Sequence, residues 1–171
     1  MPANASNSLT RRDFLRSRIS APVPEFRPPW TDDATVQSRC TGCGDCVDAC
    51  PQNILELDEN RHVRVSLRGA ECTFCKACAD ACDASVFDTE QTPPWPVVAE
   101  ISGTCLLAAG IACQLCTDIC EPQALRLDPD VRPMGRIRLE TASCTGCGAC
   151  LAPCPNTAIT LSDRRMKGLA A

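Results

Sequence analysis

Apolar and polar residues alternate along this chain only in short segments, each four or five residues long. Alternation of this kind predicts β-strands. The predicted strands cover residues 54–58, 63–67, 85–88, 125–128, 136–140 and 158–162. The tetrapeptide "ENRH" separates the first two segments, so we expect an antiparallel hairpin there and a second one from the fourth and fifth segments.

Four further segments each end in cysteine and predict single helical turns. They read "VDAC", "ADAC", "TDIC" and "LAPC" and cover residues 47–50, 79–82, 117–120 and 151–154. Short strands and short helical turns together indicate the α+β class, with small antiparallel sheets.

The chain contains an internal duplication. Trp30 and Trp95 are its two tryptophans, each follows two prolines, and each lies ten residues before a cysteine that opens a half. A constant offset between two halves is typical of a tandem repeat. We therefore expect a first module over residues 37–90 and a second module over residues 91–163, with both tryptophans packed in the core.

The two ends of the chain lack these patterns. Residues 1–36 hold five prolines and scattered arginines, a composition that predicts a flexible basic arm. Residues 164–171 predict a short loose tail.

Composition changes this picture because the apolar core is thin. The chain has 171 residues, of which 44% are hydrophobic, but that share includes 16 cysteines, and aromatic residues make up only 4%. A core this thin needs another source of stability, and cysteine chemistry is the obvious one.

Charge and residue types exclude several function classes. The net charge of −4 gives no support for nucleic-acid binding, and no apolar run approaches the ~18 residues of a membrane span. The chain has one histidine, His62, and no phosphate-binding loop, so we do not expect an enzyme.

The cysteines form four runs of four with nearly constant spacing. The runs are Cys40, Cys43, Cys46 and Cys50; Cys72, Cys75, Cys78 and Cys82; Cys105, Cys113, Cys116 and Cys120; and Cys144, Cys147, Cys150 and Cys154. The first and fourth read C-x2-C-x2-C-x3-C followed by proline, and in the second Asp83 replaces the proline. In the third run Gly110 stands where the first cysteine belongs, so Cys105 is the natural substitute.

This spacing favours iron–sulfur clusters over zinc or disulfides. Two gaps of two residues wrap a loop around one centre, and in two-cluster ferredoxins the fourth cysteine ligates the other cluster. Zinc sites usually combine two separate C-x2-C units, and disulfides inside such a run would be strained. We therefore predict four [4Fe–4S] clusters. In the third run, a three-iron cluster or an unligated Cys105 is the alternative.

Crossed ligation pairs the runs within each half. The predicted ligands are, for the first set, Cys40, Cys43, Cys46 and Cys82; for the second set, Cys72, Cys75, Cys78 and Cys50; for the third set, Cys105, Cys113, Cys116 and Cys154; and for the fourth set, Cys144, Cys147, Cys150 and Cys120. Each oxidised cluster with its thiolates carries roughly −2. The loaded protein should therefore prefer basic partner surfaces.

The arm carries "TRRDFLR" over residues 10–16, which resembles a twin-arginine export signal. Such a signal needs an apolar stretch of roughly 7–15 residues, whereas no apolar run longer than two residues follows within the arm. We therefore expect the protein to stay in the cytoplasm. Two hypotheses remain for the arm. It is either a solvated basic segment or a recognition peptide that a partner binds through Arg11, Arg12, Phe14 and Leu15.

Taken together, these features resemble the NapF family of ferredoxin-type accessory proteins of periplasmic nitrate reductase. The resemblance rests on "RPPW" before "CTGCGDCVDACP", on "ECTFCKACADAC", on "CLLAAGIACQLCTDICEPQAL" and on "CTGCGACLAPCPNTAI". It covers most of the chain, and the C-x7-C-x2-C-x3-C spacing of the third run and the paired "PPW" make it specific.

The resemblance implies a cytoplasmic protein with four [4Fe–4S] clusters. Its partner would be the catalytic subunit of periplasmic nitrate reductase before export, with a signal-binding chaperone as a second partner. Whether it delivers clusters or electrons stays open. The alternative function is that of an electron-transfer polyferredoxin subunit of a redox complex, with no role in maturation.

Overall fold

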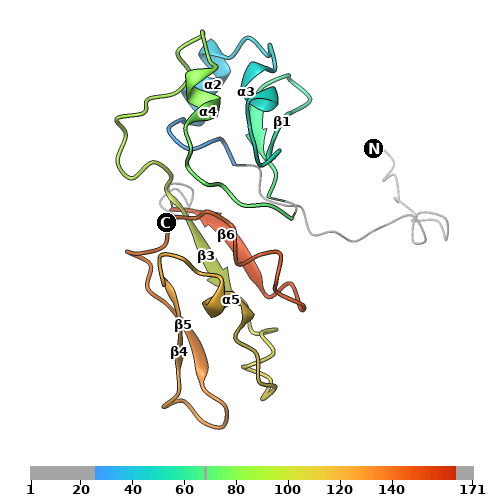
Figure 1. Cartoon of the computed structure of the whole chain (residues 1–171), viewed down its shortest axis with the longest axis vertical. Helices are drawn as coiled ribbons and strands as arrows, with labels where there is room; N and C mark the ends of the chain where they lie inside the picture. Colours follow the sequence, from blue (N-terminus) through green and yellow to red (C-terminus); the bar gives the residue numbers. More distant parts are fainter. Residues whose placement is uncertain (1–25, 68, 165–171) are drawn as a thin grey trace, which may run out of the picture.

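The computed structural model describes residues 26–67 and 69–164 and confirms the α+β class with small antiparallel sheets (Figure 1). Its helices and strands are α2 (Asp33–Arg39), α3 (Asp45–Asp48), β1 (Leu55–Leu57), β2 (Val63–Val65), α4 (Ala77–Asp80), β3 (Val97–Ile101), α5 (Leu115–Asp118), β4 (Leu125–Asp128), β5 (Arg136–Leu139) and β6 (Ile159–Asp163). Each of its three sheets contains two antiparallel strands. No helix among the described residues is long and apolar enough to cross a membrane.

Both predicted hairpins are present. In the first module β1 pairs with β2, so that Leu55 lies opposite Val65. In the second module β4 pairs with β5, so that Leu125 lies opposite Leu139. The buried residues of each hairpin lie at alternating positions, because successive side chains of a strand point to opposite faces.

The third sheet differs from the prediction. The segment predicted over 158–162 forms β6, whose partner is β3, a strand that the sequence pattern did not single out. The segment predicted over 85–88 is not a strand. Trp30 and Trp95 lie 65 residues apart, and the residues 65 positions before β3 belong mostly to helix α2. The first module therefore has a helix where the second module has β3. Residues 85–88 therefore have no neighbouring strand to satisfy their backbone groups.

Helix α2 also corrects the predicted arm over residues 1–36. The Asp32 side chain accepts a hydrogen bond from the Thr35 N–H at 2.8 Å and caps the helix. Phe26, Trp30 and Val36 are buried, so residues 26–36 pack with the first module and are not a flexible arm. Residues 1–25 and 165–171 lie outside the described residues.

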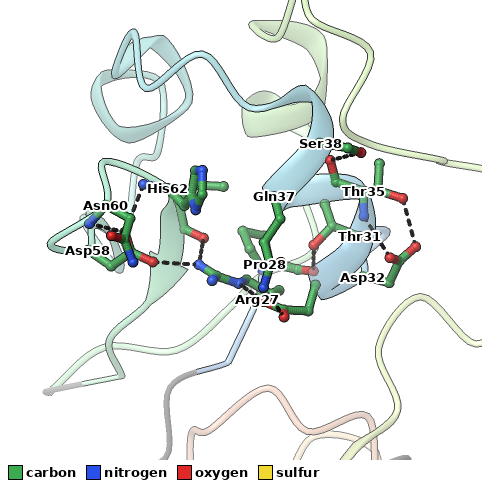
Figure 2. A network of polar contacts seen from close by, with 12 residues as sticks. Arg27, Pro28, Thr31, Asp32, Thr35, Gln37, Ser38, Asp58, Asn60 and His62 are labelled. Carbon is green, nitrogen blue, oxygen red and sulfur yellow. Dashed lines mark hydrogen bonds and ion pairs between the residues drawn. The ribbon is translucent and has the colours of Figure 1, made fainter.

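Arg27 fixes this N-terminal segment to the first hairpin (Figure 2). Its guanidinium donates to Asp33 at 2.7 Å, to Asp58 at 3.0 Å and to the Val63 carbonyl at 2.9 Å. Burial acts to raise the pKa of Asp58, but hydrogen bonds from the His62 N–H and from Arg27 outweigh it and lower that pKa below its ordinary value. The ion pair is thus held in its charged form.

Four aromatic rings join the two modules. Phe74 packs edge-on against Trp30 and Trp95, with ring centroids 6.1 and 6.4 Å apart, and Phe26 packs against Trp95 at 6.2 Å. Both tryptophans are buried, so the predicted core packing is confirmed. The sequence did not predict that both tryptophans contact one phenylalanine.

The main chain makes a second connection between the modules. The Cys72 N–H donates to the Cys147 carbonyl at 2.8 Å. Next to it, a Cβ on Gly148 would lie only 2.7 Å from the Leu67 side chain, so a glycine allows the two modules to approach this closely. The cysteine runs of the two modules therefore meet directly.

The ion pairs of Arg27 and of Arg138 predict different costs of removal. Arg27→Met leaves the carboxylate of Asp58, whose side chain is 9% exposed, without its cationic partner, so we expect the free energy of unfolding to fall by about 2 kcal/mol. The control is Arg138→Met, since Arg138 pairs with Asp128 at 2.7 Å but its side chain is 76% exposed, and here the loss should stay below about 0.5 kcal/mol. Denaturant unfolding of the cluster-loaded protein without oxygen measures both. Equal losses would show that Arg27 does not fix the segment.

Candidate metal centres

Three of the four cysteine runs close into a loop and then enter a short helix. Helix α3 contains Cys46, α4 contains Cys78 and α5 contains Cys116, in each case the third cysteine of its run. One helical turn then brings the fourth cysteine of the run back toward the core. The predicted turns of the first three runs are thus confirmed, each two residues earlier than expected.

The fourth run forms turns rather than the predicted helical turn over 151–154. In the first run the Ala49 N–H donates to the Asp45 carbonyl at 2.9 Å and completes a helical turn. Pro153 occupies the equivalent position in the fourth run and has no N–H to donate. The cysteine loop itself does not need this hydrogen bond.

The first set of thiols surrounds one apolar cavity. Its lining includes Cys40, Cys43, Cys46 and Cys82. Burial, with smaller contributions from the nearby thiols of Cys82, Cys40 and Cys43, raises the pKa of the Cys46 thiol to about 11. The structure therefore brings the last cysteine of the second run to the first three cysteines of the first run.

The second set surrounds a similar cavity. Its lining includes Cys50, Cys72, Cys75 and Cys78. Burial raises the pKa of Cys78 to about 12 and that of Cys72 to about 11, and the Cys50 thiol contributes to both shifts. Each of the two sets in the first module thus contains one cysteine from the other run.

The third set includes Cys105. Burial raises the pKa of Cys116 to about 11, and the thiol of Cys105 contributes most among its neighbours, followed by Cys113 and Cys154. Cys105 therefore lies close to the other cysteines of the third run, although its spacing in the sequence is irregular. Its role as a ligand stays a prediction.

The fourth set lies deepest in the second module. Cys150 is only 8% exposed, and burial together with Cys147 and Cys144 raises its pKa to about 12. Cys120, the predicted fourth member, packs against the hydrophobic core. Its place in the fourth set stays a prediction.

Some thiols raise the pKa of a thiol in another set, which indicates that the two sets lie close together. Cys46 contributes to the raised pKa of Cys78 and so connects the first set to the second. Cys147 contributes to that of Cys72, next to the backbone hydrogen bond between these residues, and connects the second set to the fourth. Cys116 contributes to that of Cys150 and connects the fourth set to the third, so these contacts join the sets in the order first, second, fourth, third.

The residues present fit iron–sulfur clusters. All sixteen cysteines are free thiols, and soft thiolates are the ligands that such clusters prefer. Each of the first two cavities is apolar and is lined by the four thiols of one set. No three His, Cys, Asp or Glu side chains in the described part of the chain converge closely enough to hold one metal ion. When bound, such clusters supply one-electron transfer.

The predicted partner-binding residues of the arm are Arg11, Arg12, Phe14 and Leu15. They lie outside the described residues, so their role stays a prediction.

Two residues of the second run are features that the sequence analysis missed. Phe74 and Lys76 adopt left-handed backbone with φ of 53° and 66°, whereas the first run has Gly42 and Gly44 at the same places. A comparison of the four loops residue by residue would have revealed the difference, because glycine is the usual residue in this conformation.

Comparison with known proteins agrees with this arrangement. The family model described as 4Fe-4S dicluster domain matches residues 39–86 and 111–158. Because the second match begins at residue 111, it does not include Cys105, which the structure places beside Cys116.

Several curated proteins are similar over most of the chain. The ferredoxin-type protein NapF of Escherichia coli (strain K12) is 37% identical over 152 residues, which cover 88% of this chain and 93% of that protein. The ferredoxin-type protein NapF of Haemophilus influenzae is 36% identical over 167 residues, covering 91% and 95%. The methylamine utilization ferredoxin-type protein MauM of Methylobacillus flagellatus is 29% identical over 171 residues, covering 82% and 68%.

The position of Cys105 predicts that its removal damages one centre only. In Cys105→Ser the iron content should fall from about sixteen to about twelve per chain, or a three-iron EPR signal should appear, because one ligand of the third set is lost. Ala108→Ser, in the same exposed loop, is the matched control and should keep all its iron. Unchanged iron in Cys105→Ser would mean that Cys105 is not a ligand.

The raised thiol pKa values predict how the iron-free chain responds to pH. A thiol whose pKa is higher in the folded chain than the ordinary value of 9.0 favours folding while it is protonated. Structure that remains after iron removal should therefore be lost as the pH rises from about 9 toward 12. Circular dichroism of the reduced, iron-free protein measures this, with the cluster-loaded protein as the control. Residual structure that increased over this range would contradict the assignment.

Proposed function

The chain belongs to the NapF family of ferredoxin-type iron–sulfur proteins, and we propose that it acts in the cytoplasm with four [4Fe–4S] clusters. Its target in this proposal is the catalytic subunit of periplasmic nitrate reductase, which it assists before export. Its contribution is the supply of electrons, as a carrier rather than as an enzyme.

The continuous path of thiol sets is the observation that carries this proposal. The sets of the two modules meet where the Cys72 N–H donates to the Cys147 carbonyl at 2.8 Å. A chain that only stored or delivered clusters would not need its two modules joined at their cysteine loops. A chain that conducts electrons needs close spacing from one end of the path to the other.

Burial of the thiols favours electron supply over cluster delivery. Cys46 and Cys150 are each 8% exposed and belong to the hydrophobic core, and most of the other cysteines pack against it. Release of a cluster would open this core, which contains few large side chains. Electron transfer leaves the core closed.

Charge and the arm support the proposed partners. The clusters add negative charge to a chain that already has a net charge of −4, which favours a basic docking surface on the reductase subunit. The arm resembles an export signal but lacks its apolar stretch. We propose that a signal-binding chaperone recognises Arg11 and Arg12, with Phe14 and Leu15 as apolar contacts.

The second candidate function is that of an electron-transfer polyferredoxin subunit of a redox complex, with no role in maturation. The same continuous path favours it, because conduction between two partners also needs close spacing. The two functions differ in whether the reductase is made correctly without this protein.

A deletion strain separates the two functions. Without this protein, we expect periplasmic nitrate reductase activity to fall severalfold even when a reduced viologen dye supplies the electrons, because the enzyme itself is incomplete. Expression of the intact chain from a plasmid should restore the activity. Full activity with the dye would reject the maturation role and leave the second function.

A further inference from the structure

The second cysteine run departs from the other runs at two backbone positions. The first run has Gly42 and Gly44 there, and the fourth run has glycines at the same places, all with φ between 68° and 97°. The second run has Phe74 and Lys76, which adopt the same left-handed backbone. The third run avoids this conformation at the second position, where Gln114 has a φ of −135°.

Left-handed backbone is strained for a non-glycine residue. Packing offsets this strain at Phe74, because its ring contacts Trp30 and Trp95 edge-on, and such pairs stabilise beyond the area they bury. Phe74 therefore has a structural reason to replace glycine.

Packing does not offset the strain at Lys76 in the same way. Its side chain is exposed, and its ammonium lies 5.6 Å from the centre of the Trp30 ring. A cation–π contact at an exposed site stabilises only weakly. Glycine would adopt this backbone without strain, so stability alone does not explain the lysine.

The position of Lys76 suggests another reason. Lys76 lines the same cavity as all four thiols of the second set, together with Trp30 and Phe74. Of the four equivalent loop positions, this is the one that carries a charge, since the others are Gly44, Gln114 and Gly148. The nearest charged residues along the chain are both acidic, Asp80 four positions after Lys76 and Glu71 five positions before it.

We propose that Lys76 is a positioning residue that raises the reduction potential of the cluster held by the second set. A one-electron reduction adds one negative charge inside this cavity, and the positive charge of a residue that lines the cavity favours the more negative state. The electron is thereby held in the middle of the path, beside the contact between Cys72 and Cys147. This inference rests on the proposed cluster content and is independent of the nitrate reductase partner.

The test is an EPR-monitored redox titration of the cluster-loaded full chain with dithionite. In Lys76→Gln, one of the four transitions should move to a lower potential. The equilibrium partition of the electron should change roughly two- to tenfold at low salt, where tenfold corresponds to 59 mV for one electron. The shift should shrink in 1 M salt, because an exposed charge is screened within about 3 Å there. Lys76→Arg should behave like the unmodified protein.

A reciprocal variant keeps the test decisive if Lys76→Gln binds less iron. A Cβ on Gly44 meets no atom within 4 Å, and although its φ of 97° strains any side chain there, Lys76 shows that a lysine can take left-handed backbone at the equivalent position. Gly44→Lys therefore places the same charge beside the first set and should raise a different transition. Arg126→Gln removes an exposed charge from the hairpin of the second module and should move none.

Unchanged potentials in either Lys76→Gln or Gly44→Lys with full iron would overturn the proposal, as would an equal shift in Arg126→Gln. Fewer than four clusters in the unmodified protein would instead reject the proposed cluster content. A deletion phenotype has no bearing on these potentials, so the two failures are distinguishable.

Discussion

The fold depends on the burial of cysteine thiols that lie close together. Each sheet has only two strands, and a two-stranded hairpin is marginally stable by itself in water. The thiols occupy places where larger apolar side chains would otherwise fill the core, and burial together with neighbouring thiols strongly raises the pKa of several of them. Bound clusters would therefore determine both the chemistry of the protein and its stability.

The two modules show how a duplicated unit can diverge without loss of its central geometry. Cys82 joins the first set and Cys154 lies beside Cys116 of the third, so a crossed thiol occurs in both halves, but α2 in the first module stands in place of β3 in the second. Phe74 stands where the first run has a glycine and contacts both tryptophans. The two halves thus differ at the start of each module and where their aromatic rings meet.

The sequence predicted those features that depend on residues close together in the chain. Cysteine spacing predicted which thiols meet, and the alternating segments predicted both hairpins, because loop closure and pairing there are local. The prediction failed at residues 85–88, since a strand needs a partner strand and helix α2 stands where that partner would lie. It failed at 151–154 because the effect of Pro153 was not weighed. The contact between Cys72 and Cys147 joins residues far apart in the chain and leaves no local signal.

The order of the thiol sets in space differs from their order along the chain. The fourth run is the last along the chain, yet Cys147 and Cys150 of the fourth set lie between the second set and the third. A chain that stops before residue 144 lacks three members of the fourth set and also Cys154 of the third, so only the first two sets keep all four thiols. It also lacks β6, the partner of β3. Under the proposed cluster content, a chain cut short at this end would hold iron in its first module but could not carry electrons across the contact between Cys72 and Cys147.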